Sequence, residues 1–491
     1  MKRVYIIILI LFAGFTGVMA QNLDDALRYS QVFYGGTARF MSMGGAFTAL
    51  GGDISSLSQN PAGLGVYRSS EISVTPQLFH IKTDAGFHGT SSDYMYNFNL
   101  NQAGFVSNLI KRDVQSGLVS LNFGYSFNKT NNLHQSMRIE GISPYSSMAD
   151  SWADNNYNVH YTDITGAAGL AYDSWVIDTV TGTGGAQYGT VFSNYGDDGA
   201  SVYGQTVKRL VSYEGYTGEH AISFGGNISN KFFFGGTLGI SRLKYTSHYQ
   251  HLESTSLDLN SGFKNFTYTD HYEDEGTGYT LKFGAIYKPI EALRIGFAFH
   301  SPTWYRINEY LYEDISSNFN GGEHYEYADE PTRFSYRLAT PFRALFGVAY
   351  QVKKFALLSA DYEFVDYSTA KFSDAGDDWD YSGENDVIKN SLKAANNFRI
   401  GGEFRLDKLY LRTGYGYYGK AFKSGEANED LNYNSISFGT GFRDQNFSID
   451  LGYTHMANSQ NYLLYSCYTE SATSNMDIYR NMFTVTFGYK F

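Results

Sequence analysis

The chain has 491 residues, a formal net charge of −12, 43 Tyr, 37 Phe, 52 Gly, 7 Pro and one Cys. An acidic chain without Lys/Arg blocks lacks the electrostatic footprint of a nucleic-acid-binding protein. One Cys forms neither an internal disulfide nor a Cys-rich zinc site. The excess of rings, joined to abundant Gly, favours many pleated strands over a helical bundle. We therefore expect an all-β protein that binds no nucleic acid.

The first twenty residues have the pattern of a secretory signal peptide. Two basic residues precede an apolar run over residues 4–12, and Val18 and Ala20 place small side chains just before Gln21. A membrane anchor is the alternative, but this run is short for a hydrocarbon core of roughly 30 Å. We predict that residues 1–20 are a signal peptide. Because no long apolar run follows, any membrane span must consist of strands.

Residues 21–68 precede the first expected strand and differ from the rest of the chain. They are rich in Gly, Ser, Ala and Met and lack a two-residue alternation. We interpret them as a plug, or hatch, at the periplasmic end. Within them Asn60, Pro61 and Ala62 suit a rigid turn, because Pro fixes φ and the Asn amide bonds to neighbouring backbone. A gate and a merely structural turn both remain open for this trio.

From residue 69 onward, apolar side chains alternate with small or polar ones. In the last segment Phe483, Phe487 and Phe491 point to one face, whereas Thr484 and Lys490 point to the other. The pattern predicts a transmembrane antiparallel β-barrel of about fourteen strands. These are expected at 69–81, 93–105, 116–128, 217–228, 231–248, 277–288, 292–304, 333–351, 355–371, 392–406, 409–419, 433–443, 446–456 and 479–491.

The connections between these strands alternate in length. Tight turns such as Ser229-Asn230 and Asp407-Lys408 lie at one end, and much longer loops lie at the other. Segregated loops and an even strand number are typical of outer-membrane barrels. The longest loop, 129–219, is too long to lack structure, and we expect a lid with short helices at 147–154 and 165–180.

Charge decides which face of the barrel meets lipid. If the strand at 392–406 were turned over, Arg399 and Arg405 would face hydrocarbon, at about 2–4 kcal/mol for each Arg near the midplane. The rings therefore face lipid and the charged residues line the interior. Trp304, near a strand end on the long-loop side, suits the interfacial aromatic girdle.

The N-terminal motifs resemble the FadL/TodX family of outer-membrane transporters for hydrophobic molecules. The likeness lies in residues 35–39 (GGTAR), 43–46 (MGGA), Asp53 and 60–64 (NPAGL). Weaker likeness occurs at 172–178, 222–238 and 341–343.

The resemblance implies a fourteen-strand barrel with a hatch in its lumen, in the outer membrane of a Gram-negative bacterium. It also implies plug-gated uptake of long-chain fatty acids or aromatic hydrocarbons, with exit sideways through a gap beside a kinked third strand. The long loop 129–219 departs from the family, so ligand contacts made by loops are not transferred. PorV-like barrels, which serve a protein-secretion machine as shuttles, share a similar Asn-Pro-Ala element and are the alternative.

Interior arginines are the candidate ligand-binding residues. In a largely apolar pocket, a guanidinium holds a ligand carboxylate through a strong charge-assisted bond. We predict this role for Arg294, Arg399, Arg412 and Arg443, which alternation places inward together with Arg405 and Lys282. The alternative is that they pair with acidic residues and hold barrel and plug together; the acids are Asp361, Glu363, Glu403 and Asp450.

The sequence offers no positive sign of catalysis, a metal or a cofactor. It has no HExxH or GxSxG element, and a haem role would rest on single residues such as His300. Acidic runs at 270–275 and 374–386 are expected in outer loops, where solvation is favoured over binding of cations that bridge lipopolysaccharide. We predict no enzyme activity and no cofactor, although a porphyrin is among the ligands that suit an apolar tunnel.

The expected partners follow from a barrel in a membrane. They are a hydrophobic small molecule, outer-membrane lipid with lipopolysaccharide, and the barrel-assembly machinery, which would recognise the terminal aromatic residue Phe491. We predict a monomer.

Overall fold

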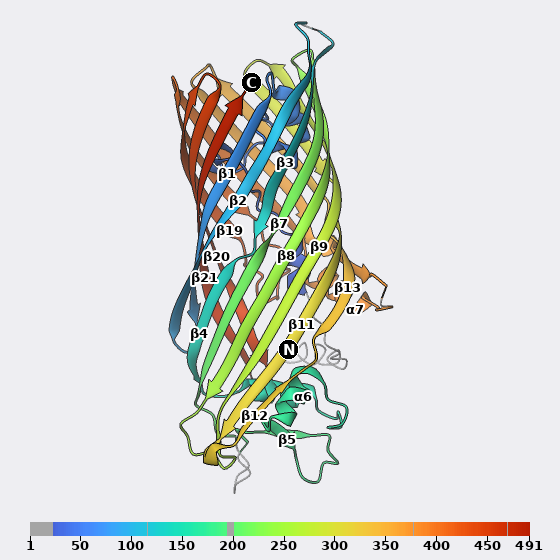
Figure 1. The fold of residues 1–491 in the computed structure, drawn as a ribbon, viewed down its shortest axis with the longest axis vertical. Helices are drawn as coiled ribbons and strands as arrows, with labels where there is room; N and C mark the ends of the chain where they lie inside the picture. The colour runs from blue at the N-terminus through green and yellow to red at the C-terminus, as the bar shows by residue number, and fades with distance from the viewer. Residues whose placement is uncertain (1–22, 115, 194–200, 377, 469) are drawn as a thin grey trace.

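The protein is a closed barrel of fourteen antiparallel strands (Figure 1). The computed structural model describes residues 23–491 except 115, 194–200, 377 and 469, so the predicted signal peptide lies outside the described residues. The barrel closes because the last strand pairs with the first, from Glu71 opposite Lys490 to Gly86 opposite Asn475. The predicted fold class is confirmed.

Several of the fourteen barrel strands are interrupted, so each of these consists of two or more separate strand elements. For example, a break at Pro302 divides β10 from β11, and a break at Pro341 divides β13 from β14. The strands are β1 (Glu71–Gly86), β2 (Thr90–Lys111), β3 (Leu118–Asn132), β4 (Gln135–Ser143), β5 (Ile177–Thr179), β6 (Tyr188–Thr190), β7 (Gln205–Ile228), β8 (Phe232–Ser254), β9 (Phe263–Ile290), β10 (Leu293–His300), β11 (Trp304–Phe319), β12 (His324–Ala328), β13 (Thr332–Ala339), β14 (Arg343–Val352), β15 (Ala356–Asp366), β16 (Lys371–Asp374), β17 (Ala394–Leu406), β18 (Leu409–Tyr418), β19 (Tyr433–Asp444), β20 (Phe447–Ser466) and β21 (Ser471–Lys490).

The barrel wall is apolar outside and polar inside, as the charge argument requires. Along β17 the outward Phe398 and Ile400 are 47% and 58% exposed, whereas the inward Arg399 between them is 1% exposed. None of the helices in the described part of the chain is long and apolar enough to cross a membrane.

The two barrel ends differ in the way that the loop lengths predict. At the short-turn end, where the C-terminus lies (Figure 1), Ser229 and Asn230 both adopt positive φ in the three-residue turn between β7 and β8. Phe491 exchanges backbone hydrogen bonds with Ser70 at this end, and its ring is exposed. At the opposite end α6 and β5 belong to a folded lid.

The N-terminal segment from Leu23 to Ser70, here called the hatch, lies inside the barrel (Figure 1). Its buried apolar residues pack against inward side chains of the wall. Phe47 and Leu50, for instance, cluster with Ala298 and Leu345 of the wall. Its elements are α2 (Leu23–Ser30), α3 (Ala38–Ser42), α4 (Ser56–Gln59) and the 3-10 helix η2 (Pro61–Val66).

The lid closes the long-loop end. Strand pairing continues into both flanks of the stretch expected as a loop, 129–219, so the segment outside the barrel strands runs from 144 to 204. Trp152 and Phe192 of the lid share one apolar cluster with Phe79 of the wall. The remaining helices are α5 (Met148–Asn155), α6 (Gly166–Asp173), α7 (Ser382–Ser391), η3 (Asn320–Gly322) and η4 (Tyr367–Thr369).

A buried carboxylate fixes the start of the lid. Glu253 of β8 is 0% exposed, and its two oxygens accept from the Ser147 hydroxyl and the Met148 amide, both at 2.7 Å. These groups begin α5, where a negative charge is favourable. The expected helix at 147–154 is thus present within a residue, while α6 is shorter than the expected 165–180 because β5 begins at Ile177.

The acidic run 270–275 does not lie in an outer loop, contrary to the sequence expectation. It belongs to β9, which rises well beyond the stretch expected as strand. Asp274 is buried in the lumen and accepts hydrogen bonds from the hydroxyls of Tyr29, Tyr272 and Tyr336 at 2.6, 2.7 and 2.8 Å. Because Tyr29 belongs to α2, this carboxylate ties the hatch to the wall.

Candidate functional site: a lateral gap and its hatch

The barrel wall has a seam where neighbouring strands are not joined by a backbone ladder. Strands β2 and β3 pair from Lys111–Ser120 up to Gln102–Asn128, and their ladder stops there. A register shift in β3 between Lys129 and Asn131 marks a bulge at the same level. Beyond it β2 keeps its ladder with β1, and the described residues show no ladder from β2 to β3 or β4, so the wall changes from a ladder to a gap.

Side chains bridge this gap. The Asn97 amide lies 3.0 Å from Nε2 of His134, and Ser91 donates to the carbonyl of Arg138 on β4. Such contacts break more easily than a continuous ladder, because each is a single bond between exposed or half-buried groups.

The hatch covers the inner side of the gap with its own backbone. The amides of Phe33 and Gly35 donate to the carbonyls of Thr130 and Lys129, at 2.7 and 2.8 Å. Asn101 of β2 donates to the carbonyl of Gly36 at 2.7 Å. Gly35 is required here, because a Cβ would lie 2.6 Å from the Lys129 carbonyl. The hatch therefore bonds to β3 carbonyls at the level where the ladder between β2 and β3 has stopped.

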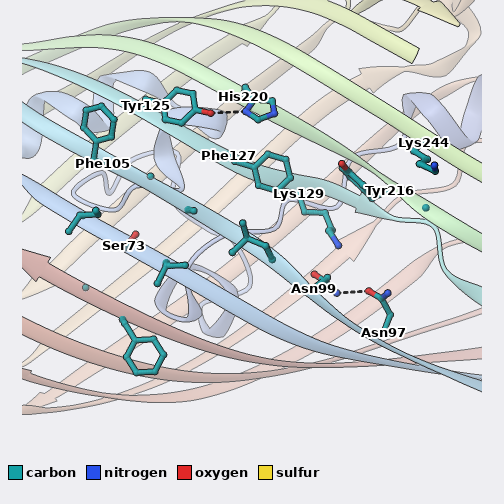
Figure 2. Close-up of a pocket in the computed structure, with 18 of the residues that line it drawn as sticks. Ser73, Asn97, Asn99, Phe105, Tyr125, Phe127, Lys129, Tyr216, His220 and Lys244 are labelled. Carbon is teal, nitrogen blue, oxygen red and sulfur yellow. Dashed lines mark hydrogen bonds between the residues drawn. The ribbon is translucent and has the colours of Figure 1, made fainter. Parts of the chain in front are cut away.

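A cavity of 1160 Å³ lies along this seam (Figure 2). Its outer part is lined by Phe105, Tyr125 and other lipid-facing apolar side chains. Its inner part carries Asn97, Asn99 and Lys129. Lys129 is 6% exposed, and no carboxylate lies within ion-pair distance of it in the part of the chain that the structure describes. The cavity suits an apolar molecule with at most one polar end.

The predicted Asn60-Pro61-Ala62 turn sits against two glycines of the wall. The Asn60 side chain accepts from the Ala62 amide at 3.1 Å and donates to the Thr48 carbonyl at 2.6 Å. A Cβ at Gly284 would overlap the Asn60 side chain, and one at Gly235 would overlap the Pro61 carbonyl. The trio is a rigid turn in close contact with the wall; its role as a gate stays a prediction.

Two of the predicted ligand-binding arginines, Arg399 and Arg412, are engaged by protein carboxylates. Arg399 lies 2.8 Å from Glu363, which also binds Arg343. Arg412 lies 2.7 Å from Glu403 and 2.6 Å from Asp450. These contacts match the structural alternative for these two residues.

The hatch joins this charge network through Arg39. Its guanidinium makes a double hydrogen bond to Glu403, at 2.8 and 3.1 Å. Burial lowers the pKa of Arg39, but the Glu403 carboxylate outweighs burial and raises that pKa above its usual value. Arg39 therefore stays charged, and removing its partner would leave a buried charge, typically at about 3–5 kcal/mol.

The other two predicted arginines, Arg294 and Arg443, face the short-turn end. Arg294 donates to the Leu50 carbonyl at 2.6 Å, and Arg443 packs over the Tyr410 ring at 4.8 Å. The structure thus gives the two pairs of arginines different surroundings and brings none of the four to the lateral gap. A role for them in ligand binding stays a prediction.

Two other inward polar residues, Asp361 and His300, bind the hatch. Asp361 accepts from the Thr48 amide and hydroxyl at 2.9 and 2.7 Å. Nε2 of His300 lies 2.7 Å from the Gln59 carbonyl, which explains this buried histidine without haem. No cluster of metal-ligating side chains is found among the described residues.

Comparison with known proteins defines the class of this barrel. The sequence model of one family, described as outer membrane protein transport protein (OMPP1/FadL/TodX), matches residues 25–491. The chain belongs to this family, as the N-terminal motifs predict. No curated protein sequence matches it significantly.

Solved structures share the fold at low identity. The toluene transporter TodX of Pseudomonas putida is 13% identical with a TM-score of 0.53, over 93% of this chain and 99% of TodX. A FadL homologue of Pseudomonas aeruginosa is 12% identical with a TM-score of 0.56, over 94% of this chain and all of the other. The PorV-like alternative gains no support from these matches.

Substituting Gly284 tests whether the turn at Asn60 contributes to the seal. In Gly284→Ala the added methyl must displace Asn60, so ion conductance in planar bilayers should rise above that of the wild type. Gly236→Ala is the matched control, because its nearest neighbour, the Lys282 carbonyl, is 3.8 Å from the new Cβ. Equal conductance of all three proteins would exclude the turn from the seal.

Proposed function

We propose that the protein takes up hydrophobic small molecules through the outer membrane of a Gram-negative bacterium and releases them sideways into lipid. The observation that carries the proposal is the seam between β2 and β3. There the backbone ladder stops, and a cavity of 1160 Å³ extends from half-buried polar groups to lipid-facing rings. Family membership supports transport, and the toluene transporter TodX is one protein of this fold.

The barrel axis offers a poor route for such a molecule. The hatch packs against the wall around Phe47 and Leu57, and its charged contacts are buried. An apolar molecule on the axis would have to separate those ion pairs. A molecule at the seam needs only to displace residues 33–36 and a few exposed side-chain contacts, and then meets lipid.

The chemistry of the cavity favours a long acyl chain with a carboxylate. Burial of each CH₂ against rings contributes about 0.8 kcal/mol before ordering costs. Lys129, at the inner end of the cavity, supplies a cation with no carboxylate partner among the described residues. Aromatic hydrocarbons fit the same apolar wall without using Lys129, and they are the second class of substrate.

The partners expected from the sequence belong to this proposal. Exposed rings of the wall would contact lipid, and the strands and lid that rise beyond them would contact lipopolysaccharide. The exposed Phe491 is available to the assembly machinery, and the protein would act as a monomer and not as an enzyme.

Cross-linking the seam tests the sideways route. In a Cys467→Ser background, the pair Asn97→Cys and His134→Cys is joined by a short bismaleimide, which should abolish uptake of labelled oleate and toluene by intact cells. The control pair, Arg242→Cys with Thr277→Cys, replaces a similar polar contact in the continuous β8–β9 ladder and should leave uptake unchanged. Full uptake through the cross-linked seam would contradict lateral release.

Replacing Lys129 separates the two substrate classes. Lys129→Met keeps the apolar stem but removes the charge, so uptake of oleate should fall about tenfold while uptake of toluene persists. Lys244→Met is the control, because Lys244 lines the same cavity but is paired with Glu275 at 3.1 Å. An equal effect of Lys129→Met on both substrates would rule out Lys129 as the carboxylate partner.

A further inference from the structure

A second cavity lies at the short-turn end, away from the seam. It has a volume of 390 Å³ and is enclosed by the hatch and by the ends of the barrel strands around it. The hatch contributes Gly51, Gly52 and the segment from Val66 to Ser69. None of the residues that line this cavity lines the cavity at the seam.

The lining of this cavity is strongly cationic in a chain whose net charge is −12. Arg39, Arg294 and Arg443 form its inner part, and the only acidic residue described in the lining is Glu403. That carboxylate is bound directly by Arg39 and Arg412 and interacts with Arg443 only at longer range, so one acid does not balance all of these cations. Four more cations line the cavity, namely Arg68, Lys354, Arg405 and Lys490, of which Lys490 is paired with Glu71 at 3.4 Å.

Arg294 and Arg443 line this cavity without forming an ion pair in the described structure. Arg294 donates one N–H to the Leu50 carbonyl, and Arg443 packs over Tyr410. Among the residues that the structure describes, no carboxylate lies within ion-pair distance of either guanidinium. A half-buried guanidinium with no carboxylate at ion-pair distance is costly in a partly enclosed site, and an anion in the cavity would lower that cost.

Tyr67 adds an independent sign of a ligand. Its ring is 4% exposed and lines the cavity, and its hydroxyl is buried without a hydrogen-bond partner in the described structure. Burial, together with the nearby carboxylates of Glu71 and Asp53, raises the pKa of Tyr67 well above its usual value, so the hydroxyl keeps its proton. Buried hydroxyls are nearly always bonded. An acceptor atom in the cavity would satisfy this one.

We propose that this cavity binds a phosphate group from the periplasmic side, held by Arg294, Arg443 and the Tyr67 hydroxyl. Two guanidiniums and one neutral donor match the charge and the several oxygens of a phosphate. The outer cations would raise the local concentration of such anions. The cavity is larger than one phosphate and includes Leu50 and Leu357, so the head group of a phospholipid fits as well as the free ion.

Titration calorimetry of the purified full-length protein in an uncharged detergent tests the site. The probes are inorganic phosphate and dihexanoyl phosphatidylglycerol, which carry the same group with and without a lipid. We expect at least one of them to bind, and to bind more weakly as salt is added. Binding of both identifies a general phosphate site, and binding of the lipid alone identifies a head-group site.

Two variants and one control decide the assignment. Arg294→Gln with Arg443→Gln should weaken binding at least about tenfold, and Tyr67→Phe should weaken it several-fold with no change in charge or volume. Arg333→Gln removes an exposed arginine from β13 and should bind as the wild type does. Absence of binding by either probe, or equal binding by wild type, double variant and Tyr67→Phe, would overturn the proposal.

Discussion

The structure depends on one constraint: irregular backbone placed at membrane depth must find its hydrogen-bond partners within the protein. The hatch has few regular elements, so many of its carbonyls have no partner in their own segment. Inward side chains of the wall supply them. The donor and acceptor pairs are Arg343 with Ser30, Arg294 with Leu50, Thr237 with Leu57, Lys282 with Ser58, His300 with Gln59, and Asn122 with Leu64.

This constraint explains why the lumen is both polar and closed. These inward donors are fixed by hatch carbonyls, and the charge of Lys282 is also balanced by a buried acid, Glu219, at 2.6 Å. Moving the whole hatch would break these bonds together. The weak place is the seam, where the hatch contributes only a short backbone pairing at residues 33–36 and the wall contributes side-chain bridges.

Much of the fold was predictable because lipid imposes a strict two-residue period. Strands facing hydrocarbon, such as that around Ile400, must alternate, and their short turns must be tight. Above the membrane this constraint ends, because β9 faces solvent on its outer side and packs against α2 on its inner side. The charged run 270–275 therefore breaks the alternation of apolar and polar side chains, and the sequence wrongly predicts a loop there. Strand β7 was placed twelve residues too short at its start for the same reason.

The candidate site was predictable only in part. Alternation placed the arginines inside, but it could not distinguish Arg399, which forms an ion pair with Glu363, from Arg443, which has no carboxylate at ion-pair distance in the described structure. Their partners lie far away in sequence. The seam itself leaves one local sign, a break of alternation at Asn128 and Lys129, which are both buried. The sequence does not single out Lys129 or Tyr67, because their importance depends on their burial and on the absence of a partner for the Lys129 charge and the Tyr67 hydroxyl in the described structure.

The most direct test of the central claim is to locate a substrate during passage. Cells that make the protein are supplied with a fatty acid carrying a diazirine within its chain, and the protein is irradiated and mapped by mass spectrometry. Lateral release predicts labelled peptides that contain Phe105, Tyr125 or Phe127, on the paired part of β2 and β3 that borders the seam. Labels confined to the short-turn cavity around Arg39 and Tyr67 would show passage along the barrel axis and would contradict the account.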